Sequence, residues 1–227
     1  MQKYAVIVAG GSGLRMGADK PKQFLLLRGK PILYHTLQQF LKAFPDLIIY
    51  LVLPHDFLLE GQELIQEFGA IANIQLVVGG ATRFHSVQNG LHKITEPGIV
   101  FVHDGVRCLL TEGLIKHCYE QALEKGSAIP AVAATDSIRI VNAMGSHVVN
   151  RDLVRIIQTP QTFQTNLLLP VFETDYQDSF TDEATVLEAS GQQVYLIEGE
   201  YNNIKITRPV DLVIAENILI QREQGSN

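Results

Sequence analysis

The sequence predicts a single α/β domain with a Rossmann-like, doubly wound and mostly parallel sheet, helices on both faces of that sheet, and one protruding β-arm. Three observations favour this fold. Apolar strand-like runs alternate with helix-like segments over the first two thirds of the 227 residues. The first of these runs ends in a glycine-dense turn. A hairpin pattern with partly polar faces then interrupts the alternation after residue 134.

The first half of the chain supplies most of the parallel pattern. Tyr4–Ala9 is an apolar run typical of a buried parallel strand. Pro31 is suited to open a helix, whose apolar residues recur at helical spacing until Pro45. The same patterns predict further strands at 48–53, 74–78 and 99–102, and helices at 56–69 and around Val87 and Leu91.

The second half is less regular. Thr111 is expected to cap a helix that Gly126 ends, and a strand follows at 127–134. Residues 136–157 are predicted to form the β-arm, and 193–197 a strand. Thr181 is expected to cap a later helix, with Asp182 and Glu183 in its first turn. Residues 202–207 alternate like a strand, which directs Lys205 away from the apolar residues and towards solvent. A last helix begins at Pro209.

Composition narrows the class of protein. The length suits one domain covering residues 1–227, and 46% hydrophobic residues allow a sizeable core. The first strand begins close to Met1 and no apolar run is long enough to span a bilayer, so we expect a cytoplasmic protein. Cys108 and Cys118 have no zinc-site spacing and are expected to be free thiols. A net charge of −6 argues against nucleic-acid or membrane partners and requires a local basic pocket for any anionic ligand.

The turn Gly10–Gly17 with the nearby Lys20 and Lys22 predicts a polyphosphate site. Glycines let backbone N–H groups approach an anion, and Arg15 adds positive charge at the same place. The spacing matches neither the phosphate loop of NTPases nor the dinucleotide fingerprint. An ordinary strand-to-helix turn would not explain the three clustered cations. The surroundings of Ser12 also lack the last glycine of a hydrolase nucleophile elbow.

Polar clusters follow four of the predicted strands, where open α/β sheets bind ligands. Asp104 is a candidate Mg²⁺ ligand, with an Asp-Gly turn as the alternative role. Arg107 can pair with a phosphate or with Asp104. Arg83 and Ser86 can face a ligand, but Arg83 can equally neutralise carboxylates of neighbouring loops. These alternatives stay open at this level.

The order of these motifs resembles that of the 2-C-methyl-D-erythritol 4-phosphate cytidylyltransferases of isoprenoid biosynthesis, members of the sugar-phosphate nucleotidyltransferase group. The resemblance runs nearly end to end, and each motif is short while their joint order is specific. It is carried by the glycine turn through Arg15 and Met16, Pro21–Gln23, Gly79–Arg83 with Ser86, His103-Asp104 with Arg107, Thr159–Gln161, Thr181–Ala184, and Asn203–Thr207 before Pro209.

The resemblance implies a role for individual residues. Arg15 and Lys22 would hold the triphosphate of CTP and stabilise the transition state. The nucleotide would be bordered by Ala9, Gly10, Gly11, Gly13, Gly80 and Ser86. The acceptor would be held by Asp104, Arg107 and Lys205, with Asp104 near Mg²⁺ or another divalent cation, and by Ser137 and Arg151 from the β-arm of a second subunit in a homodimer.

The implied reaction transfers CMP from CTP to 2-C-methyl-D-erythritol 4-phosphate and releases pyrophosphate. Another polyol phosphate, such as ribitol 5-phosphate, is the alternative acceptor. A nicotinamide-dependent reductase and a nucleotide-sensing module without turnover are rivals from other classes, and the absence of an acidic residue placed to hold a ribose weighs against the reductase. The chain departs from the family at Gly105, Val106 and Cys108, where Ala-Ala and Pro are common, and has Ser137 for a common Thr. Family members often have an Asp before the lysine that corresponds to Lys205. Glu200 only approximates its position, so we expect no site role for Glu200.

Overall fold

A computed structural model describes residues 1–11, 21–69 and 72–225. Its central sheet has the strand order β10-β7-β11-β6-β1-β4-β5, and β12 pairs with β7. The strands are β1 (Gln2–Val8), β4 (Ile48–Leu53), β5 (Ile74–Val78), β6 (Gly98–Asp104), β7 (Ser127–Ala133), β10 (Arg155–Ile157), β11 (Gln161–Gln164) and β12 (Leu196–Glu198). Parallel pairing joins β6, β1, β4 and β5, whereas β11 is antiparallel to β6 and β7, and β10 is antiparallel to β7. The predicted mostly parallel sheet is confirmed.

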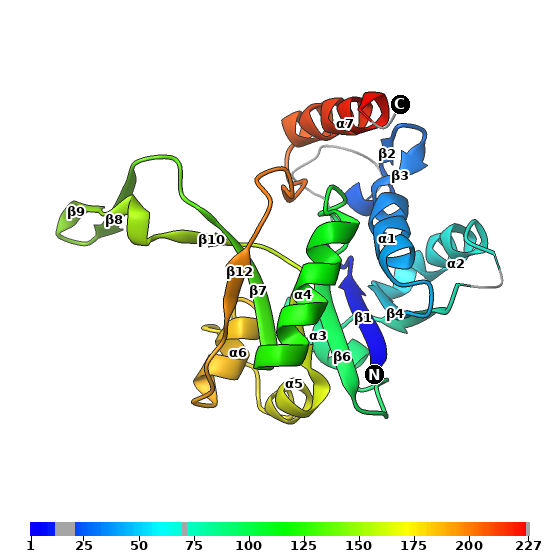
Figure 1. Ribbon diagram of the computed structural model, residues 1–227, viewed down its shortest axis with the longest axis horizontal. Coiled ribbons are helices and arrows are strands. Elements are labelled where there is room, and N and C mark those ends of the chain that lie inside the picture. Colours follow the sequence, from blue (N-terminus) through cyan, green and yellow to red (C-terminus); the bar gives the residue numbers. More distant parts are fainter. Residues whose placement is uncertain (12–20, 70–71, 226–227) are drawn as a thin grey trace.

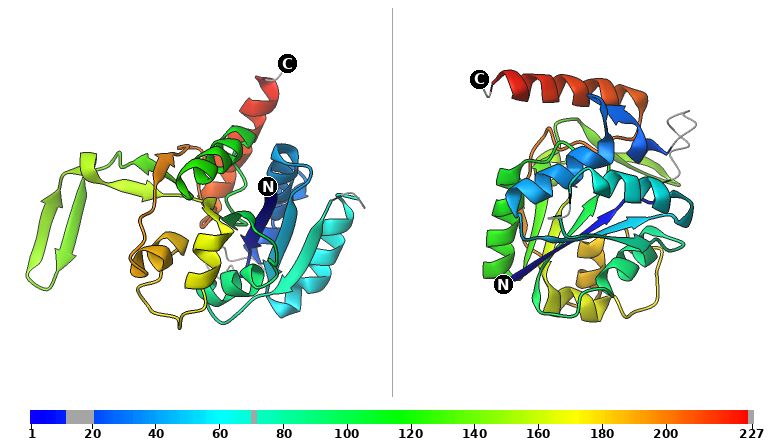
Figure 2. Two further views of the ribbon diagram at one scale, coloured as in Figure 1. Left: turned by 60° about the horizontal axis from the view of Figure 1, so that its bottom comes forward. Right: turned by 90° about the vertical axis from the view of Figure 1, so that its right-hand side faces the viewer.

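Helices cover both faces of the sheet (Figure 2). One face carries α1 (Ile32–Ala43), α2 (Leu58–Gln66) and α4 (Glu112–Lys125), and the other carries α3 (Arg83–Leu91), α5 (Thr165–Val171) and α6 (Glu183–Ala189). Alternate residues of β1 serve the two cores: Ala5 and Ile7 lie in the first, and Val6 and Val8 in the second. This alternation is the pattern of a strand buried on both sides, so burial of apolar area fixes β1 at the centre of the sheet.

The predicted helix ends are mostly confirmed. The Thr111 hydroxyl accepts a hydrogen bond from the backbone N–H of Leu114, and Gly126 ends α4 with a φ of +90°. The prediction for α6 was one residue early, because the cap is Asp182 and not Thr181. The Asp182 carboxylate accepts a hydrogen bond from the backbone N–H of Thr185. A carboxylate can cap a helix in this way as well as a Thr hydroxyl can.

A two-stranded hairpin projects far from the sheet (Figure 1). It consists of β8 (Ile138–Asn142) and β9 (Gly145–Val149), followed by the 3-10 turn Arg151–Leu153. β10, at the end of the predicted arm, returns to pair with β7 in the main sheet. The hairpin exposes apolar side chains along its length, including Val141 at 77% and Met144 at 98%.

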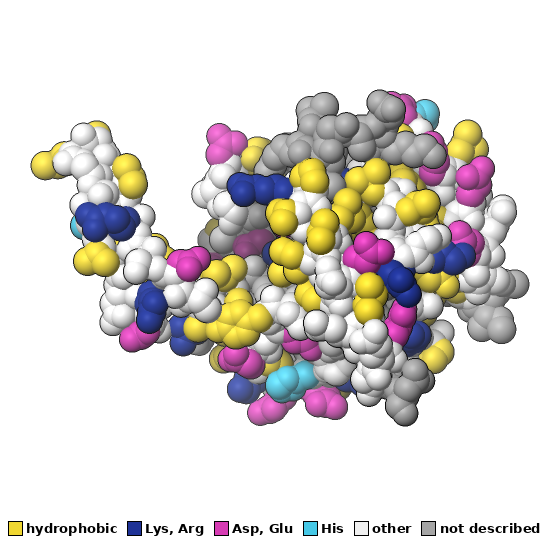
Figure 3. Space-filling view, turned by 90° about the horizontal axis from the view of Figure 1, so that it is seen from above, with side chains coloured by type: hydrophobic (Ala, Val, Ile, Leu, Met, Phe, Trp, Pro, Cys, Tyr) yellow, Lys and Arg dark blue, Asp and Glu magenta, His cyan; other side chains and the backbone are white. Residues whose placement is uncertain are grey.

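The last helix, α7 (Pro209–Gln224), begins at Pro209 as predicted. It packs beside the small hairpin of β2 (Leu26–Leu27) and β3 (Lys30–Pro31), with Leu27, Ile206 and Ala215 in a third core. Figure 3 shows apolar side chains gathered on this side of the molecule. In the described ranges, none of the helices combines the length and the apolar character that crossing a membrane requires. Short 3-10 segments at Lys22–Phe24 and His55–Phe57 follow the glycine turn and β4.

Candidate active site

A cavity of about 720 Å³ opens beyond the carboxyl ends of β1, β4, β5 and β6. This is the edge at which open α/β sheets bind ligands. Eight predicted site residues line it: Ala9, Gly10, Gly11, Lys22, Gly80, Ser86, Asp104 and Lys205. The structure therefore brings residues far apart in the sequence into one cavity. Gly13 and Arg15 lie outside the described residues.

One wall of the cavity is the loop between β5 and α3. The backbone N–H of Gly80 donates to Oγ of Ser86 at 3.1 Å, and that hydroxyl donates to the carbonyl of Thr82 at 2.9 Å. Thr82 in turn caps α3. A Cβ at Gly80 would lie 2.4 Å from Cβ of His85, so a side chain there would force the loop apart. The predicted pair Gly80 and Ser86 thus forms one rigid surface facing the cavity.

A second part of the cavity lining comes from Gly10 and Gly11 before the undescribed residues and from Lys22 and Gln23 after them. The side chain of Lys22 passes close to the backbone, since a Cβ built on Gly11 would lie 3.5 Å from Cε of Lys22. Gln23 is buried, and its Nε2 donates to the carbonyl of Ala9 at 2.7 Å. This bond fixes the exit of β1 against the segment that carries Lys22.

The floor of the cavity contains a buried carboxylate surrounded by cations. Asp104 Oδ2 lies 2.8 Å from Nζ of Lys205 and 3.6 Å from Nε of Arg107, and Oδ1 lies 3.2 Å from Nε of Arg83. Burial would raise the pKa of Asp104, but Arg83 and Lys205 hold it well below its ordinary value. Asp104 is therefore ionised across the physiological range. Burial lowers the pKa of Arg107.

The segment that carries Lys205 corrects one expectation from the sequence. Residues 202–207 form no strand, and the Lys205 side chain, which is 40% exposed, places its ammonium against Asp104 and lines the cavity. The backbone N–H of Ile206 donates to the carbonyl of Val106 at 3.0 Å, which ties this segment to the loop after β6. Local alternation predicted the exposure of Lys205 correctly but not the backbone, because this tertiary contact, and not a sheet, sets the conformation of the segment.

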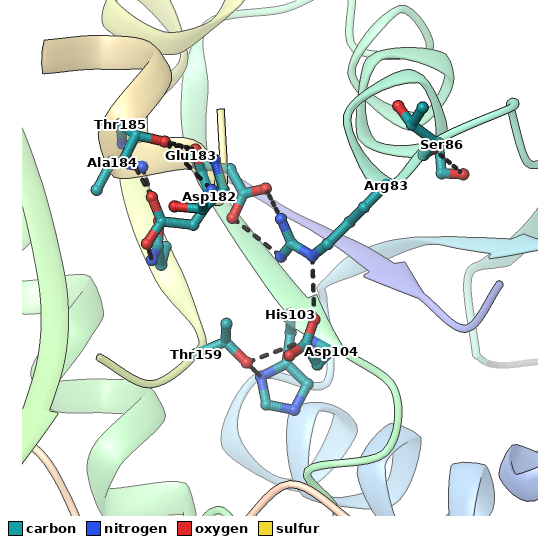
Figure 4. Close-up of polar contacts among 12 residues, drawn as sticks. Arg83, Ser86, His103, Asp104, Thr159, Asp182, Glu183, Ala184 and Thr185 are labelled. Carbon is teal, nitrogen blue, oxygen red and sulfur yellow. Dashed lines mark hydrogen bonds and ion pairs between the residues drawn. The ribbon is translucent and has the colours of Figure 1, made fainter. Parts of the chain in front are cut away.

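His103 and Thr159 hold the loop after β6 in place (Figure 4). The backbone N–H of Asp104 donates to Oγ1 of Thr159 at 3.1 Å, and that hydroxyl lies 2.9 Å from Nδ1 of His103. Nε2 of His103 lies 3.2 Å from the carbonyl of Arg107. Burial lowers the pKa of His103 to about 3, so the ring is neutral: Nδ1 accepts from Thr159, and Nε2–H donates to Arg107.

The remaining predicted residues lie outside this cavity. Arg107 is mostly buried beneath it and donates to the carbonyl of Asn203 at 2.9 Å. Ser137 and Arg151 are exposed on the projecting segment, and Arg151 donates to the carbonyl of Thr135 at 2.8 Å. Neither arm residue lines the cavity of its own chain, as far as the described residues extend.

Sequence reasoning missed several supporting residues. Gln23 and Thr159 belong to short motifs that the sequence displays, but nothing local indicated that they bond to the backbone of β1 and β6. Glu183 was explained as a helix-start acid, although it is a buried partner of Arg83. Glu200 accepts from the hydroxyl of Thr111 at the start of α4. Cys108 is buried, which raises the pKa of its thiol to about 12, and both cysteines are free as predicted.

Comparisons with known proteins agree on one family. The family model of 2-C-methyl-D-erythritol 4-phosphate cytidylyltransferase (IspD) matches residues 4–221. Enzymes of that name from Phocaeicola vulgatus and Bacteroides thetaiotaomicron are 42% and 44% identical over 219 residues, which is 96% of this chain and 100% of each relative. The crystal structure of 4-diphosphocytidyl-2C-methyl-D-erythritol synthase from Anaerococcus prevotii superposes with a TM-score of 0.81 at 30% identity, covering 96% of this chain and 98% of that one.

The neutral state of His103 predicts a pH dependence of stability. Between pH 6.5 and about 3 the unfolded chain binds a proton at His103 that the folded chain does not bind, so stability falls as the pH is lowered through this window. His103→Gln should flatten the slope of the unfolding free energy by up to about 1.4 kcal/mol per pH unit. Urea unfolding with EDTA present, from pH 7 to pH 4, measures this slope.

His117→Gln is the matched control, because His117 is exposed on α4, and it should keep the wild-type slope. An unchanged slope in His103→Gln would show that the buried imidazole is protonated in the folded state.

Proposed function

The chain belongs to the 2-C-methyl-D-erythritol 4-phosphate cytidylyltransferase family, and from this membership we propose how its own residues perform the reaction. It is a CTP-dependent enzyme of isoprenoid biosynthesis that transfers CMP to 2-C-methyl-D-erythritol 4-phosphate. The observation that carries the assignment of roles is the cavity in which Gly10, Gly11, Lys22, Ser86, Asp104 and Lys205 meet.

The reaction needs alignment and charge neutralisation more than proton transfer. An oxygen of the acceptor phosphate attacks the α-phosphorus of CTP, and the bond from that phosphorus to the bridging β-oxygen breaks. Pyrophosphate takes the electron pair, and CDP-methylerythritol forms. Because a phosphate oxygen is already ionised at neutral pH, no general base is required. Lys22 and Arg15 would neutralise the charge that builds on the triphosphate as the bond breaks.

The acceptor would bind at the Asp104 end of the cavity. Lys205 and Arg107 lie on the same Asp104 oxygen and would supply positive charge to the acceptor phosphate. The family resemblance also implies that Ser137 and Arg151 bind this phosphate, and both are exposed on the projecting arm. We therefore propose a homodimer in which the arm of one subunit completes the acceptor pocket of the other.

A divalent cation would enter this site with its nucleotide. In the described ranges no group of three or more His, Cys, Asp or Glu side chains is arranged to hold a metal. Asp104 is the only carboxylate lining the cavity there, and both of its oxygens have cationic partners. Because this donor set does not make a metal site by itself, we propose that Mg²⁺ is carried by triphosphate oxygens of CTP and only approaches Asp104.

Pyrophosphate release tests the function directly. The protein with CTP and Mg²⁺ should release pyrophosphate when 2-C-methyl-D-erythritol 4-phosphate is added, and far less with ribitol 5-phosphate. Equal or greater release with ribitol 5-phosphate would transfer the assignment to the other acceptor. CTP binding without any release would indicate a nucleotide-sensing module.

Lys22→Ala tests the proposed transition-state role. Turnover should fall by about 10²–10³, because a preorganised donor to the developing charge is lost. The dissociation constant of CTP should change much less, since the ground state retains its other contacts. Steady-state kinetics and calorimetric CTP titration give the two values, and near-normal turnover would remove Lys22 from the mechanism.

Mixing two inactive variants tests the shared pocket. Lys22→Ala damages the body of a site and Arg151→Ala damages the arm, so each homodimer should be nearly inactive. After equal amounts are mixed and subunits exchange, half of the dimers are hybrids with one intact site each. Activity should therefore recover to about one quarter of the wild-type value. Lack of recovery, with exchange verified by differently tagged subunits, would place Arg151 in the pocket of its own chain.

A further inference from the structure

Arg83 lies between two carboxylates that come from different parts of the chain (Figure 4). It begins α3, directly after the loop that carries Gly80. Its Nη1 and Nη2 donate to Oε1 and Oε2 of Glu183 at 2.5 and 3.2 Å, and its Nε donates to Oδ1 of Asp104 at 3.2 Å. Each guanidinium nitrogen thus donates to a protein carboxylate, so Arg83 is arranged as an internal partner although it lines the cavity.

Glu183 is placed to hold Arg83 rather than to start its own helix. Asp182 already caps α6, and the side chain of Glu183 is 1% exposed. Both of its oxygens accept from the guanidinium of Arg83. A buried carboxylate needs such a partner, and a bidentate pair also fixes the orientation of the guanidinium plane. Burial would lower the pKa of Arg83, but the adjacent Glu183 and Asp104 carboxylates raise it above its ordinary value.

This fixed guanidinium divides the two oxygens of Asp104 between different partners. Arg83 occupies Oδ1, whereas Lys205 and Arg107 share Oδ2. Without Arg83, the plane of the Asp104 carboxylate could rotate about its last bond, and Oδ2 would leave its position between Lys205 and Arg107. Lys205 and Arg107 would then lose a fixed reference point. The separation of partners is therefore a geometric consequence of the Arg83–Glu183 pair.

We propose that Arg83 and Glu183 form a positioning pair for the acceptor side of the reaction. By holding Asp104 Oδ1, the pair aims Oδ2 at Lys205, which lines the cavity and would face the acceptor phosphate, and at Arg107, which adds positive charge from outside the cavity. Neither residue would touch the reacting atoms, because all three guanidinium nitrogens of Arg83 already donate to carboxylates and Glu183 is outside the cavity lining. This role rests on the proposed assignment of Lys205 and Arg107 to the acceptor, and it makes acceptor binding depend on a carboxylate that lies buried behind the cavity wall.

The alternative is that the Arg83–Glu183 pair only stabilises the fold. The two roles predict different effects on stability and on the KM values of the two substrates. A structural role would alter stability and affect both substrates together, or neither. A positioning role weakens acceptor use while CTP, whose proposed contacts include the glycine turn, Gly80 and Ser86, is used nearly as before.

Glu183→Gln is the first variant, because it keeps the shape of the side chain and removes the charge that holds Arg83. The KM for 2-C-methyl-D-erythritol 4-phosphate should rise about 10-fold, while the KM for CTP changes less than about twofold. Arg83→Lys keeps the charge but loses the planar fork, and it should shift the acceptor KM in the same direction. Glu223→Gln, which breaks the exposed pair with Arg28, is the matched control and should change neither KM.

The double variant Arg83→Met with Glu183→Met separates positioning from stability. Two apolar side chains leave no uncompensated buried charge at Glu183, so this variant should melt at a higher temperature than Glu183→Gln. Its acceptor KM should nevertheless stay raised, because Asp104 Oδ1 still lacks Arg83. Recovery of the wild-type acceptor KM, or equal changes in both KM values in all variants, would overturn the proposal. Absence of pyrophosphate release by the wild-type protein would instead overturn the proposed function.

Discussion

The structure depends on compensating the charge of one carboxylate at the end of the central strand β6. Asp104 is almost completely buried, and a buried ion without partners would be strongly destabilising. Its partners come from three segments. Arg83 comes from the start of α3, Arg107 from the loop after β6, and Lys205 from the segment before α7. The ion pairs therefore fix the relative positions of the cavity walls, and function and folding share the same contacts.

The balance of charge in this cluster explains why an anion fits there. Within the described residues the cluster contains three cations, Arg83, Arg107 and Lys205, and two carboxylates, Asp104 and Glu183. One positive charge is left over in a partly desolvated place, where electrostatic interactions are stronger than in water. A protein with a net charge of −6 can thus still concentrate positive potential at one cavity. This supports the proposed capture of a phosphate-bearing acceptor.

Local patterns in the sequence predicted what depends on local forces. The parallel strands β1, β4, β5 and β6, the Thr111 cap, the Gly126 helix end and the start of α7 follow from periodicity and backbone preference, and all are confirmed. Lys205 is exposed as alternation predicted, but its segment forms no strand, because a hydrogen bond from Ile206 to the loop after β6 sets the backbone there. Arg83 was left between two roles, and its partner Glu183 lies 100 residues away in the sequence. No local signal can pair charges across that distance; only the assembled sheet does so.

In the proposed homodimer, the arm would carry the part of the acceptor pocket that the rest of one chain does not supply. Its hairpin exposes Val141 at 77%, Met144 at 98% and Val148 at 68%, which is much apolar surface for so short a segment. Covering such surface is favourable by about 25 cal/mol per Å², and no other element of the described chain covers these side chains. A second subunit would bury the hairpin and receive Arg151 in the same step. Dimerisation and completion of the acceptor pocket would then be one event. This would explain why the arm of a single chain exposes so much apolar surface.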